Sequence, residues 1–429
     1  MSHDPQKAPE TEPLAGAQGP RPRLLFLCQT LPYPPDGGVW IRSFHVLRRL
    51  SEAFDVTALC FERTGESGRR RENDAVESLR VLGAYARIEA FPIPQTHSRA
   101  RLLWDHLRSV ATRRVYTRYL YASTAFEQRL REVLDQQAFD LVHVDSLDLA
   151  GYLPLCDPLP TVCVHHNVES ELLRRRSEFE AGRLGPYYRL QADLMEREER
   201  RWVPRLALNV MVSEDDRRVI ERLAPGGRYC VVPNGVDVEE FAPGEGRDEG
   251  LAYVGGTNWF PNLDALDHFC EDIQPHLRAA GAEFPVHWVG SATAEQQAHY
   301  RERHGVELTG YVDDVRPYMR DSFCNIVPLR SGGGTRLKIL NSWAMGKAVV
   351  STSVGCEGLE ARDGENILVR DDPRAFAEAI LALSRDAALR RRLGAAARRT
   401  AEETYSWEGV GQAMNQRYLE LIGRGADPR

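Results

Sequence analysis

Residues 328–346 read PLRSGGGTRLKILNSWAMG, a stretch that joins an apolar run, a glycine loop and a segment of helical pattern. Three consecutive glycines, 332–334, follow the buried strand pattern, and the helical pattern starts near Thr335. Glycines let the backbone approach a ligand closely, and the free N–H groups at a helix start attract an anion. Arg336 and Lys338 add two cations at that end, which suits a diphosphate better than a carboxylate. The stretch predicts an anion-binding turn; a tight turn with solvated basic residues is the alternative.

The rest of the chain alternates short apolar runs with longer stretches of helical period, which predicts parallel βαβ units. A Pro-, Gly- and charge-rich segment at 241–249, FAPGEGRDE, separates two series of such runs. The 429 residues also exceed what one hydrophobic core usually organises. The strands are predicted at 23–29, 55–60, 140–145, 160–165, 208–212 and 229–232, and then at 250–254, 284–290, 323–329 and 347–352. The prediction is an α/β protein with two doubly wound domains, which place ligands at the carboxyl ends of their strands.

Composition excludes several classes of protein. Residues 1–22 are rich in Pro, Gly, Ala and Gln, which predicts a disordered tail without the apolar core of a signal peptide. No window approaches the roughly 20 apolar residues of a membrane span, so we expect a cytoplasmic protein. The eight cysteines form no CxxC pair, which disfavours a zinc site, and the net charge of −7 argues against nucleic acid as a partner.

Three further segments accompany the glycine loop: VVPNGVDVEEF at 231–241, LTGYVDDVRPY at 308–318 and STSVGCEGLEARDGENILV at 351–369. In order and spacing, the four segments resemble the retaining GT-B glycosyltransferases of family 4, in the branch with a GGGTR loop. The resemblance extends from about residue 23 to about residue 421, and PNGVD and the glycine loop are its most specific parts. It implies two Rossmann-like domains that face a central cleft and transfer of a sugar from a nucleotide-sugar donor, with retention, to an acceptor hydroxyl.

The resemblance also implies domain limits. We expect an N-terminal acceptor-side domain over 23–240, a linker at 241–249 and a nucleotide-sugar-binding domain over 250–404. A C-terminal helix within 405–429 should pack back on the first domain, as it does in GT-B enzymes.

Site residues follow from the resemblance position by position. In the second domain the donor-binding candidates are Gly255, Gly256, Gly333, Gly334, Thr335, Arg336, Lys338 and Asn341. Many family members have two glutamates at the positions of Gly333 and Asn341, the second of which binds the ribose hydroxyls. An amide at Asn341 still offers hydrogen bonds to these hydroxyls, but without a charge. No cation follows the first strand of this domain, so Arg336 and Lys338, alone or with Arg330, must neutralise the diphosphate.

In the first domain, Gly37 and Gly38 occupy the loop PYPPDGGVWIR at 32–42, which resembles the glycine loop over the donor phosphates, with Arg42 a weaker candidate. The segment VHHNVESE at 164–171 carries the family's histidine, which alignment to the HN pair places at His166. Arg336, Lys338 and His166 are therefore the candidates closest to the chemistry. Because the leaving diphosphate takes the acceptor's proton, no metal and no other cofactor is expected.

Other features allow two interpretations. Trp259 either lines the base pocket or belongs to the core, and the core is favoured. The segment 99–121, with six arginines among Trp and Tyr residues, either touches an anionic membrane or lipid-linked acceptor or forms a helix whose apolar side is core, and the core is again favoured. The acceptor is a glycan, a lipid-linked sugar or a small molecule, and peripheral contact with the inner membrane face stays open. A catalytically silent nucleotide-binding partner and a GT-B sugar-nucleotide epimerase are the alternative functions.

Overall fold

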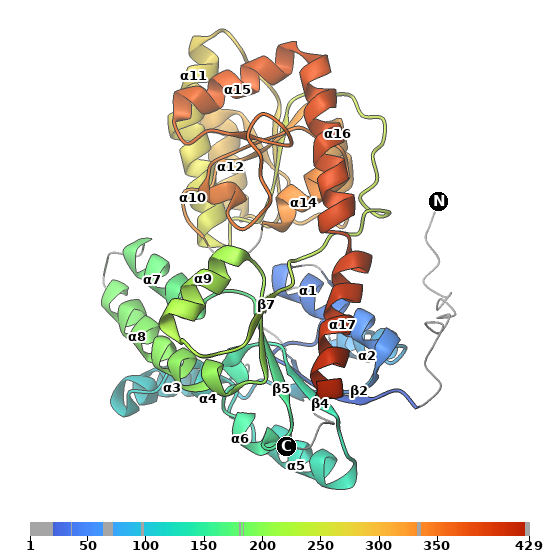
Figure 1. Cartoon of the computed structure of the whole chain (residues 1–429). Coiled ribbons are helices and arrows are strands. Elements are labelled where there is room, and N and C mark those ends of the chain that lie inside the picture. The colour runs from blue at the N-terminus through green and yellow to red at the C-terminus, as the bar shows by residue number, and fades with distance from the viewer. Residues whose placement is uncertain are drawn as a thin grey trace. The chain divides into compact units, whose positions relative to one another are not determined.

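The computed structural model describes residues 20–35, 37–62, 72–95, 98–179, 182, 184–332 and 336–424. The chain divides into two compact units, one formed by Met1–Val232 with Gly411–Arg429 and the other by Pro233–Val410 (Figure 1). Each unit contains its own hydrophobic core, built on one parallel sheet.

The sheet of the first unit has seven parallel strands in the order β3-β2-β1-β4-β5-β6-β7. Its central strands are nearly continuous runs of buried residues, most of them Leu, Val, Phe and Cys, as expected for a parallel sheet covered on both faces. The strands are β1 (Arg23–Cys28), β2 (Asp55–Glu62), β3 (Arg87–Pro92), β4 (Leu141–Val144), β5 (Thr161–His165), β6 (Leu208–Met211) and β7 (Tyr229–Val231).

The helices of this unit connect successive strands, and α7 packs against α8 as a helical pair (Figure 1). Their bounds are α1 (Gly38–Ala53), α2 (Glu72–Leu82), α3 (Arg99–Thr112), α4 (Thr117–Leu120), α5 (Thr124–Gln136), η1 (Leu147–Leu149), α6 (Leu153–Cys156), α7 (Glu169–Phe179), α8 (Gly185–Trp202), η2 (Val203–Arg205) and α9 (Glu214–Leu223).

The second unit repeats the same plan with six parallel strands in the order β10-β9-β8-β11-β12-β13. The strands are β8 (Leu251–Val254), β9 (Val286–Val289), β10 (Val306–Leu308), β11 (Cys324–Val327), β12 (Val349–Ser351) and β13 (Leu368–Val369). The helical segments are α10 (Phe260–His268), η3 (Phe269–Ile273), α11 (Gln274–Ala279), α12 (Ala294–His304), α13 (Arg316–Asp321), α14 (Leu337–Ala344), η4 (Val354–Cys356), α15 (Pro373–Arg385) and α16 (Ala387–Thr404). The last helix, α17 (Trp407–Arg424), begins in this unit and belongs to the first from Gly411 onward.

The predicted α/β class with two doubly wound sheets is confirmed, and every predicted strand is present. Three strands were not predicted: β3, β10 and β13. They lie at sheet edges, and β10 and β13 have only three and two residues. Edge strands of this kind lack the continuous apolar run by which a buried strand is recognised.

The boundary between the units differs from the prediction. It falls after Val232, and the predicted linker 241–249 is fixed to the second unit, where Arg247 pairs with Asp321 at 2.7 Å. The preceding PNGVD segment is held in the same way, because the N–H of Val236 donates to the carbonyl of Tyr405 at 2.7 Å.

The C-terminal helix α17 belongs to the first unit from Gly411 onward. There the amide of Asn415 donates to the carbonyl of Arg49 at 2.8 Å, and the ring of Tyr418 packs against Phe54. Tyr418 is fully buried, so the end of the chain completes the core of its first unit.

In both units the strand order reverses at one place. The connection after β1 leads toward one edge of the first sheet and the connection after β4 toward the other edge. The connections after β8 and β11 do the same in the second sheet. Open α/β sheets bind ligands outside the carboxyl ends of the strands at such a switch point. The loops that begin at residues 29, 145, 255 and 328 are therefore the places where each unit is expected to bind a ligand.

Candidate functional site

The loop after β8 contains Gly255 and Gly256, which cross the end of β9. A Cβ on Gly256 would lie 3.0 Å from the backbone nitrogen and oxygen of Ser291, and one on Gly290 would lie 2.6 Å from the Gly256 nitrogen. The two strand ends thus touch backbone to backbone, which only glycine permits. The side-chain amide of Asn262 donates to the Gly256 carbonyl at 2.9 Å and so fixes this loop to the start of α10.

Lys338, on the first turn of α14, contacts the same residue, Asn262. Its Nζ donates to the hydroxyl of Tyr253 and, at 2.9 Å, to Oδ1 of Asn262, and it lies 4.0 Å from the centre of the Tyr253 ring. Burial lowers the pKa of the Lys338 ammonium well below its ordinary value, and the nearby charge of Arg336 lowers it further. A bound anion would oppose this lowering of the Lys338 pKa.

Arg336 directly precedes α14 and is nearly buried. Its guanidinium donates to the carbonyl of Val354 at 3.2 Å and lies 3.7 Å from the carboxylate of Glu357, both in the loop after β12. The guanidinium also lies beside Gly332, whose φ of +128° is in the region that favours glycine. The structure thus brings Arg336 and Lys338 together at the switch point of the second sheet.

The remaining predicted residues of this unit have mixed outcomes. Gly333, Gly334 and Thr335 lie outside the described residues. Asn341 lies on α14 one turn after Lys338, on the same face of the helix. Arg330 is held by Asp264 at 2.6 Å, so its charge is already partly compensated.

The preference for Trp259 as a core residue is wrong. Its side chain is 44% exposed, because it precedes the first turn of α10 and faces solvent rather than the sheet.

In the first unit, Gly37 and Gly38 lie at the start of α1, the helix that follows the switch-point strand β1. This first turn contains no acidic residue, and no described side chain caps it, so the helix start retains its positive end. Arg42, the weaker candidate, is fully buried and donates to the carbonyl of Val232 at 2.8 Å. Burial lowers its pKa to about 10, while the charge of Asp145 opposes that shift.

His166 follows β5 and contacts Asp145, the residue that follows β4. Its Nε2 donates to the backbone carbonyl of Asp145 at 2.7 Å and lies 3.4 Å from the Asp145 carboxylate. His165, in contrast, ends the strand and makes a 3.0 Å hydrogen bond with Asn209 on β6. Burial lowers the pKa of His165 to about 4, so it is a neutral part of the core. The two adjacent histidines therefore point to different surroundings, and only His166 adjoins the carboxylate.

Asp145 is the central group of this region, and sequence reasoning missed it. Its buried carboxylate accepts hydrogen bonds from Ser43, from the Cys28 thiol at 3.3 Å and from His143 at 3.5 Å. Burial alone would raise the pKa of Asp145, but His166 and His143 lower it well below its ordinary value. The available signal was an acidic residue at the end of the buried run 140–145 (DLVHVD), where a carboxylate is costly unless it is paired.

The hydrogen-bond chain continues to the C-terminal helix. Nδ1 of His143 pairs with the hydroxyl of Tyr418 at 2.9 Å, and the imidazole stacks on Phe26 at 4.3 Å. Tyr418, His143, Asp145 and His166 thus form one buried series within the first unit. α17 consequently supports the position of His166 from far along the sequence.

A second set of carboxyl groups, Asp148, Glu169 and Glu199, interacts electrostatically, and Asp148 also interacts with His166. Burial and, to a smaller extent, the neighbouring charge of Asp148 raise the pKa of Glu169 to about 8. Burial also raises the pKa of Glu199 to about 7, although Ser170 donates to that carboxylate. Glu169 was part of the quoted segment 164–171 but was not selected, since a perturbed pKa depends on neighbours that the sequence does not show.

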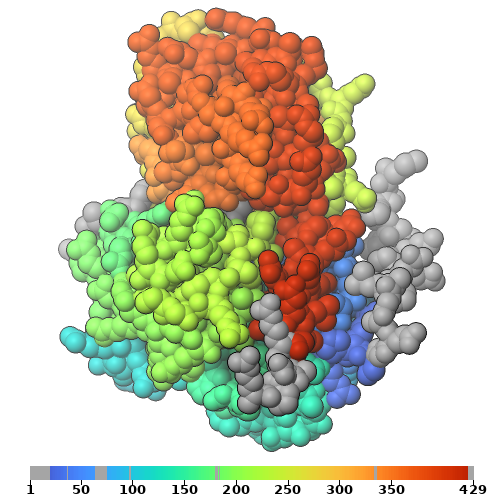
Figure 2. Space-filling model, in the orientation of Figure 1, coloured from blue at the N-terminus to red at the C-terminus, as the bar shows by residue number. Residues whose placement is uncertain are grey.

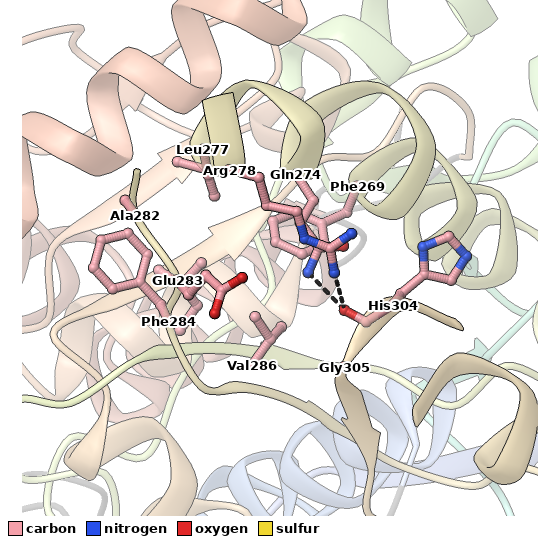
Figure 3. Close-up of a pocket in the computed structure, with 11 residues that line it drawn as sticks. Phe269, Gln274, Leu277, Arg278, Ala282, Glu283, Phe284, Val286, His304 and Gly305 are labelled. Atoms are coloured by element: carbon pink, nitrogen blue, oxygen red, sulfur yellow. Dashed lines mark hydrogen bonds between the residues drawn. The ribbon is translucent and has the colours of Figure 1, made fainter. Parts of the chain in front are cut away.

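Figure 3 shows a cavity of about 210 Å³ in the second unit, away from these loops. Leu251 and Val286, which line it, begin β8 and β9. The cavity therefore lies at the amino ends of these strands, whereas Gly255 follows the carboxyl end of β8. Gln274 and Arg278 both donate to the carbonyl of His304 there, at 2.9 and 2.8 Å. Two of its polar side chains thus bond to the backbone of the chain itself. Because the cavity also lies away from the switch-point loops, it is not the candidate site.

Within the described ranges, no group of three or more His, Cys, Asp or Glu side chains is arranged to hold a metal ion. No described helix combines the length and the apolar character required to cross a membrane.

Comparison with known proteins identifies the family. The model described as "Glycosyltransferase Family 4" matches residues 36–240, and the one described as "Glycosyl transferases group 1" matches residues 248–386. Together they cover most of both units. The chain belongs to the group 1, family 4 glycosyltransferases, and its two Rossmann-like units are those of the GT-B fold.

One curated relative is the lipopolysaccharide core biosynthesis glycosyltransferase LpsE of Rhizobium meliloti, 36% identical over 121 residues. This match covers 27% of the chain and 34% of the relative, so the chain spans about a third of that protein.

Two solved structures share the fold over nearly the full chain. The sucrose-phosphate synthase of Thermosynechococcus elongatus has a TM-score of 0.67 at 15% identity, covering 94% of this chain and all (100%) of that one. Anabaena HepE in complex with UDP has a TM-score of 0.64 at 12% identity, covering 93% and 100%.

Proposed function

We propose that the protein transfers a sugar from a nucleotide-sugar donor to the hydroxyl of a carbohydrate acceptor, with retention of the anomeric configuration. The observation that carries this proposal is the pair Arg336 and Lys338, brought to the switch point of the second sheet beside Gly332. Two cations next to a glycine turn fit a diphosphate, which is the leaving group of such a donor.

The state of Lys338 supports the assignment. Burial and the charge of Arg336 lower the pKa of the Lys338 ammonium, and a bound anion would raise it. A diphosphate supplies that anion, so donor binding should be accompanied by proton uptake at Lys338. Calorimetry in two buffers of different ionisation enthalpy measures this uptake, and a Lys338→Met variant should abolish it.

In the proposed reaction the bond between the anomeric carbon and the diphosphate oxygen breaks, and a bond to the acceptor oxygen forms on the same face. The acceptor proton passes to the departing diphosphate, whose charge Arg336 and Lys338 stabilise. His166, oriented by Asp145, is proposed to bind the donor sugar. No metal is required in this scheme, because the protein supplies the compensating charge, so EDTA should leave the rate unchanged.

The relatives support a carbohydrate acceptor. One structural neighbour, TarM of S. aureus, was solved with alpha-GlcNAc-glycerol and UDP, and another, HepE, with UDP-glucose. These are properties of those proteins, and we extend them to this chain as a proposal. A lipid-linked sugar and a free glycan are both acceptors of the proposed chemistry.

The test is release of nucleoside diphosphate from a panel that begins with UDP-glucose, first without and then with candidate acceptors. We expect release that depends on acceptor and a product of retained configuration by nuclear magnetic resonance. Binding without release from any donor would indicate a silent nucleotide-binding protein instead. Conversion of the donor into an isomeric sugar nucleotide would indicate an epimerase.

A further inference from the structure

Helix α3 buries polar side chains and exposes apolar ones. Its fully buried residues are polar, Asp105 and Ser109, whereas Leu103, Trp104 and Leu107 are 63%, 61% and 56% exposed. The expectation that the apolar side of this helix belongs to the core is therefore wrong. In Figures 1 and 2 this part of the chain, coloured cyan, lies at the surface of the first unit.

The buried side of α3 is fixed by specific hydrogen bonds. Asp105 accepts from Gln95 at 2.7 Å and from Arg101 at 2.8 Å. Ser109 donates to the carbonyl of Arg114 and accepts from Gln191 of α8, at 2.7 and 2.8 Å. Turning the helix to bury its leucines would leave these groups unpaired, at a cost of several kcal/mol. The outward orientation of the apolar side is thus enforced by the fold.

The exposed side forms one continuous stripe. Leu103, Leu107 and Val110 follow one another at helical spacing, and Trp104 adjoins them on the same side. We call these four residues the α3 stripe. An exposed tryptophan among aliphatic side chains is unusual for a surface that contacts water alone.

The charge around the α3 stripe indicates what covers it. The segment 98–122 contains six arginines and a single acidic residue, the buried and paired Asp105, although the whole chain has a net charge of −7. Arg99 and Arg108 lie on either side of the stripe, and Arg113 and Arg114 follow the end of the helix; all four are exposed. A cationic border around Trp and Leu side chains matches the interface of an anionic bilayer, where the apolar side enters the headgroup boundary.

We propose that α3 is a membrane-docking helix that binds the surface of a bilayer containing anionic lipid through the α3 stripe and its flanking arginines. The helix lies in the plane of the interface and does not cross the bilayer. This proposal concerns a surface of the first unit alone and does not depend on the identity of donor or acceptor.

The experiment is sedimentation of the full chain with phosphatidylcholine vesicles and with vesicles that also contain phosphatidylglycerol. We expect binding to the anionic vesicles that weakens as salt is added, and little binding to the neutral ones. The triple variant Leu103→Ser, Trp104→Ser, Leu107→Ser should lower the partition coefficient at least about tenfold. Because the replaced side chains are exposed, the thermal midpoint of the variant should stay unchanged.

Two further variants make the test specific. Arg99→Gln with Arg108→Gln should weaken binding to anionic vesicles about thirtyfold, because two charges near the anionic surface are removed. Val76→Ser, at a 71% exposed position on α2, is the matched apolar control and should bind like the unmodified protein.

A full chain that does not sediment with anionic vesicles would overturn the proposal, as would a Val76→Ser variant that loses as much binding as the triple variant. If light scattering instead shows a dimer that the triple variant dissociates, the α3 stripe is an interface between copies and the membrane assignment fails. Binding of UDP by the triple variant, which the proposal leaves intact, separates this outcome from misfolding.

Discussion

The carboxyl-end loops of the two units share a topology but differ in chemistry. In the first unit, a buried carboxylate, Asp145, is surrounded by histidines, hydroxyls and a thiol. In the second, two cations, Arg336 and Lys338, are held by neutral oxygen atoms and a partly exposed carboxylate. The same strand order therefore presents a buried, hydrogen-bonded carboxylate in one unit and a pair of cationic side chains in the other. The difference teaches that the fold supplies the location and the residues after each strand supply the function.

The difference predicts unequal costs for removing a charge. Asp145→Asn removes the buried carboxylate that accepts hydrogen bonds from Ser43, the Cys28 thiol and His143, so the free energy of unfolding should fall by about 3–5 kcal/mol. Asp264→Asn in the second unit only releases Arg330, which is about half exposed, and should cost about 1 kcal/mol or less. Urea denaturation of both variants measures the contrast. Equal costs would show that the Asp145 network is no more than another ion pair.

A second contrast concerns pH. The pKa of Glu169 is about 8 in the folded protein against 4.5 ordinarily, so its ionisation destabilises the fold as the pH rises between those values. The unmodified chain should therefore lose stability between pH 5 and pH 9. Glu169→Gln should lose about 2–4 kcal/mol less over the same pH range.

Glu171→Gln is the matched control for this pH effect, because Glu171 lies on the same helix and is partly exposed beside Arg175. It should leave the pH dependence of the thermal midpoint unchanged. The Glu169 assignment fails if the two variants have parallel pH profiles.

The adjacent histidines allow the role of His166 to be separated from packing. His166→Ala should lower kcat/KM of the folded fraction about a hundredfold, which corresponds to about 2.7 kcal/mol. His165→Ala removes the partner of Asn209 and should instead lower the thermal midpoint, with near-normal kcat for the folded fraction. Steady-state kinetics together with thermal unfolding distinguish the two. The reverse pattern would place His165, rather than His166, at the donor sugar.

The general architecture followed from the sequence because buried parallel strands are recognisable as apolar runs. Gly332 and Arg336 could also be placed, since a strand, a glycine turn and a helix are contiguous. Asp145 and Tyr418 could not be connected, because they lie in different parts of the chain and meet only through His143. The orientation of α3 was mispredicted for a related reason: hydrogen bonds of Asp105 and Ser109 outweigh the apolar pattern.

The smallest predicted effect is at Asn341, the position at which related enzymes place a glutamate. Charge-assisted hydrogen bonds contribute about 1.5–3 kcal/mol against about 1 for neutral ones. Asn341→Glu should therefore tighten donor binding about tenfold, as measured by titration calorimetry with a donor that the unmodified protein binds. Unchanged or weaker binding would mean that the ribose lies elsewhere or that the pocket is adapted to an amide.

The central claim is that the second unit binds the donor through its diphosphate. Titration of UDP into the unmodified protein and into the double variant Arg336→Ala, Lys338→Ala tests it most directly. Arg330→Ala is the control, because that guanidinium is held by Asp264. The expected result is at least a hundredfold loss of UDP affinity in the double variant, from two lost charge-assisted contacts, with the thermal midpoint of unfolding retained and the control unaffected. An unchanged affinity in the folded double variant would contradict the claim.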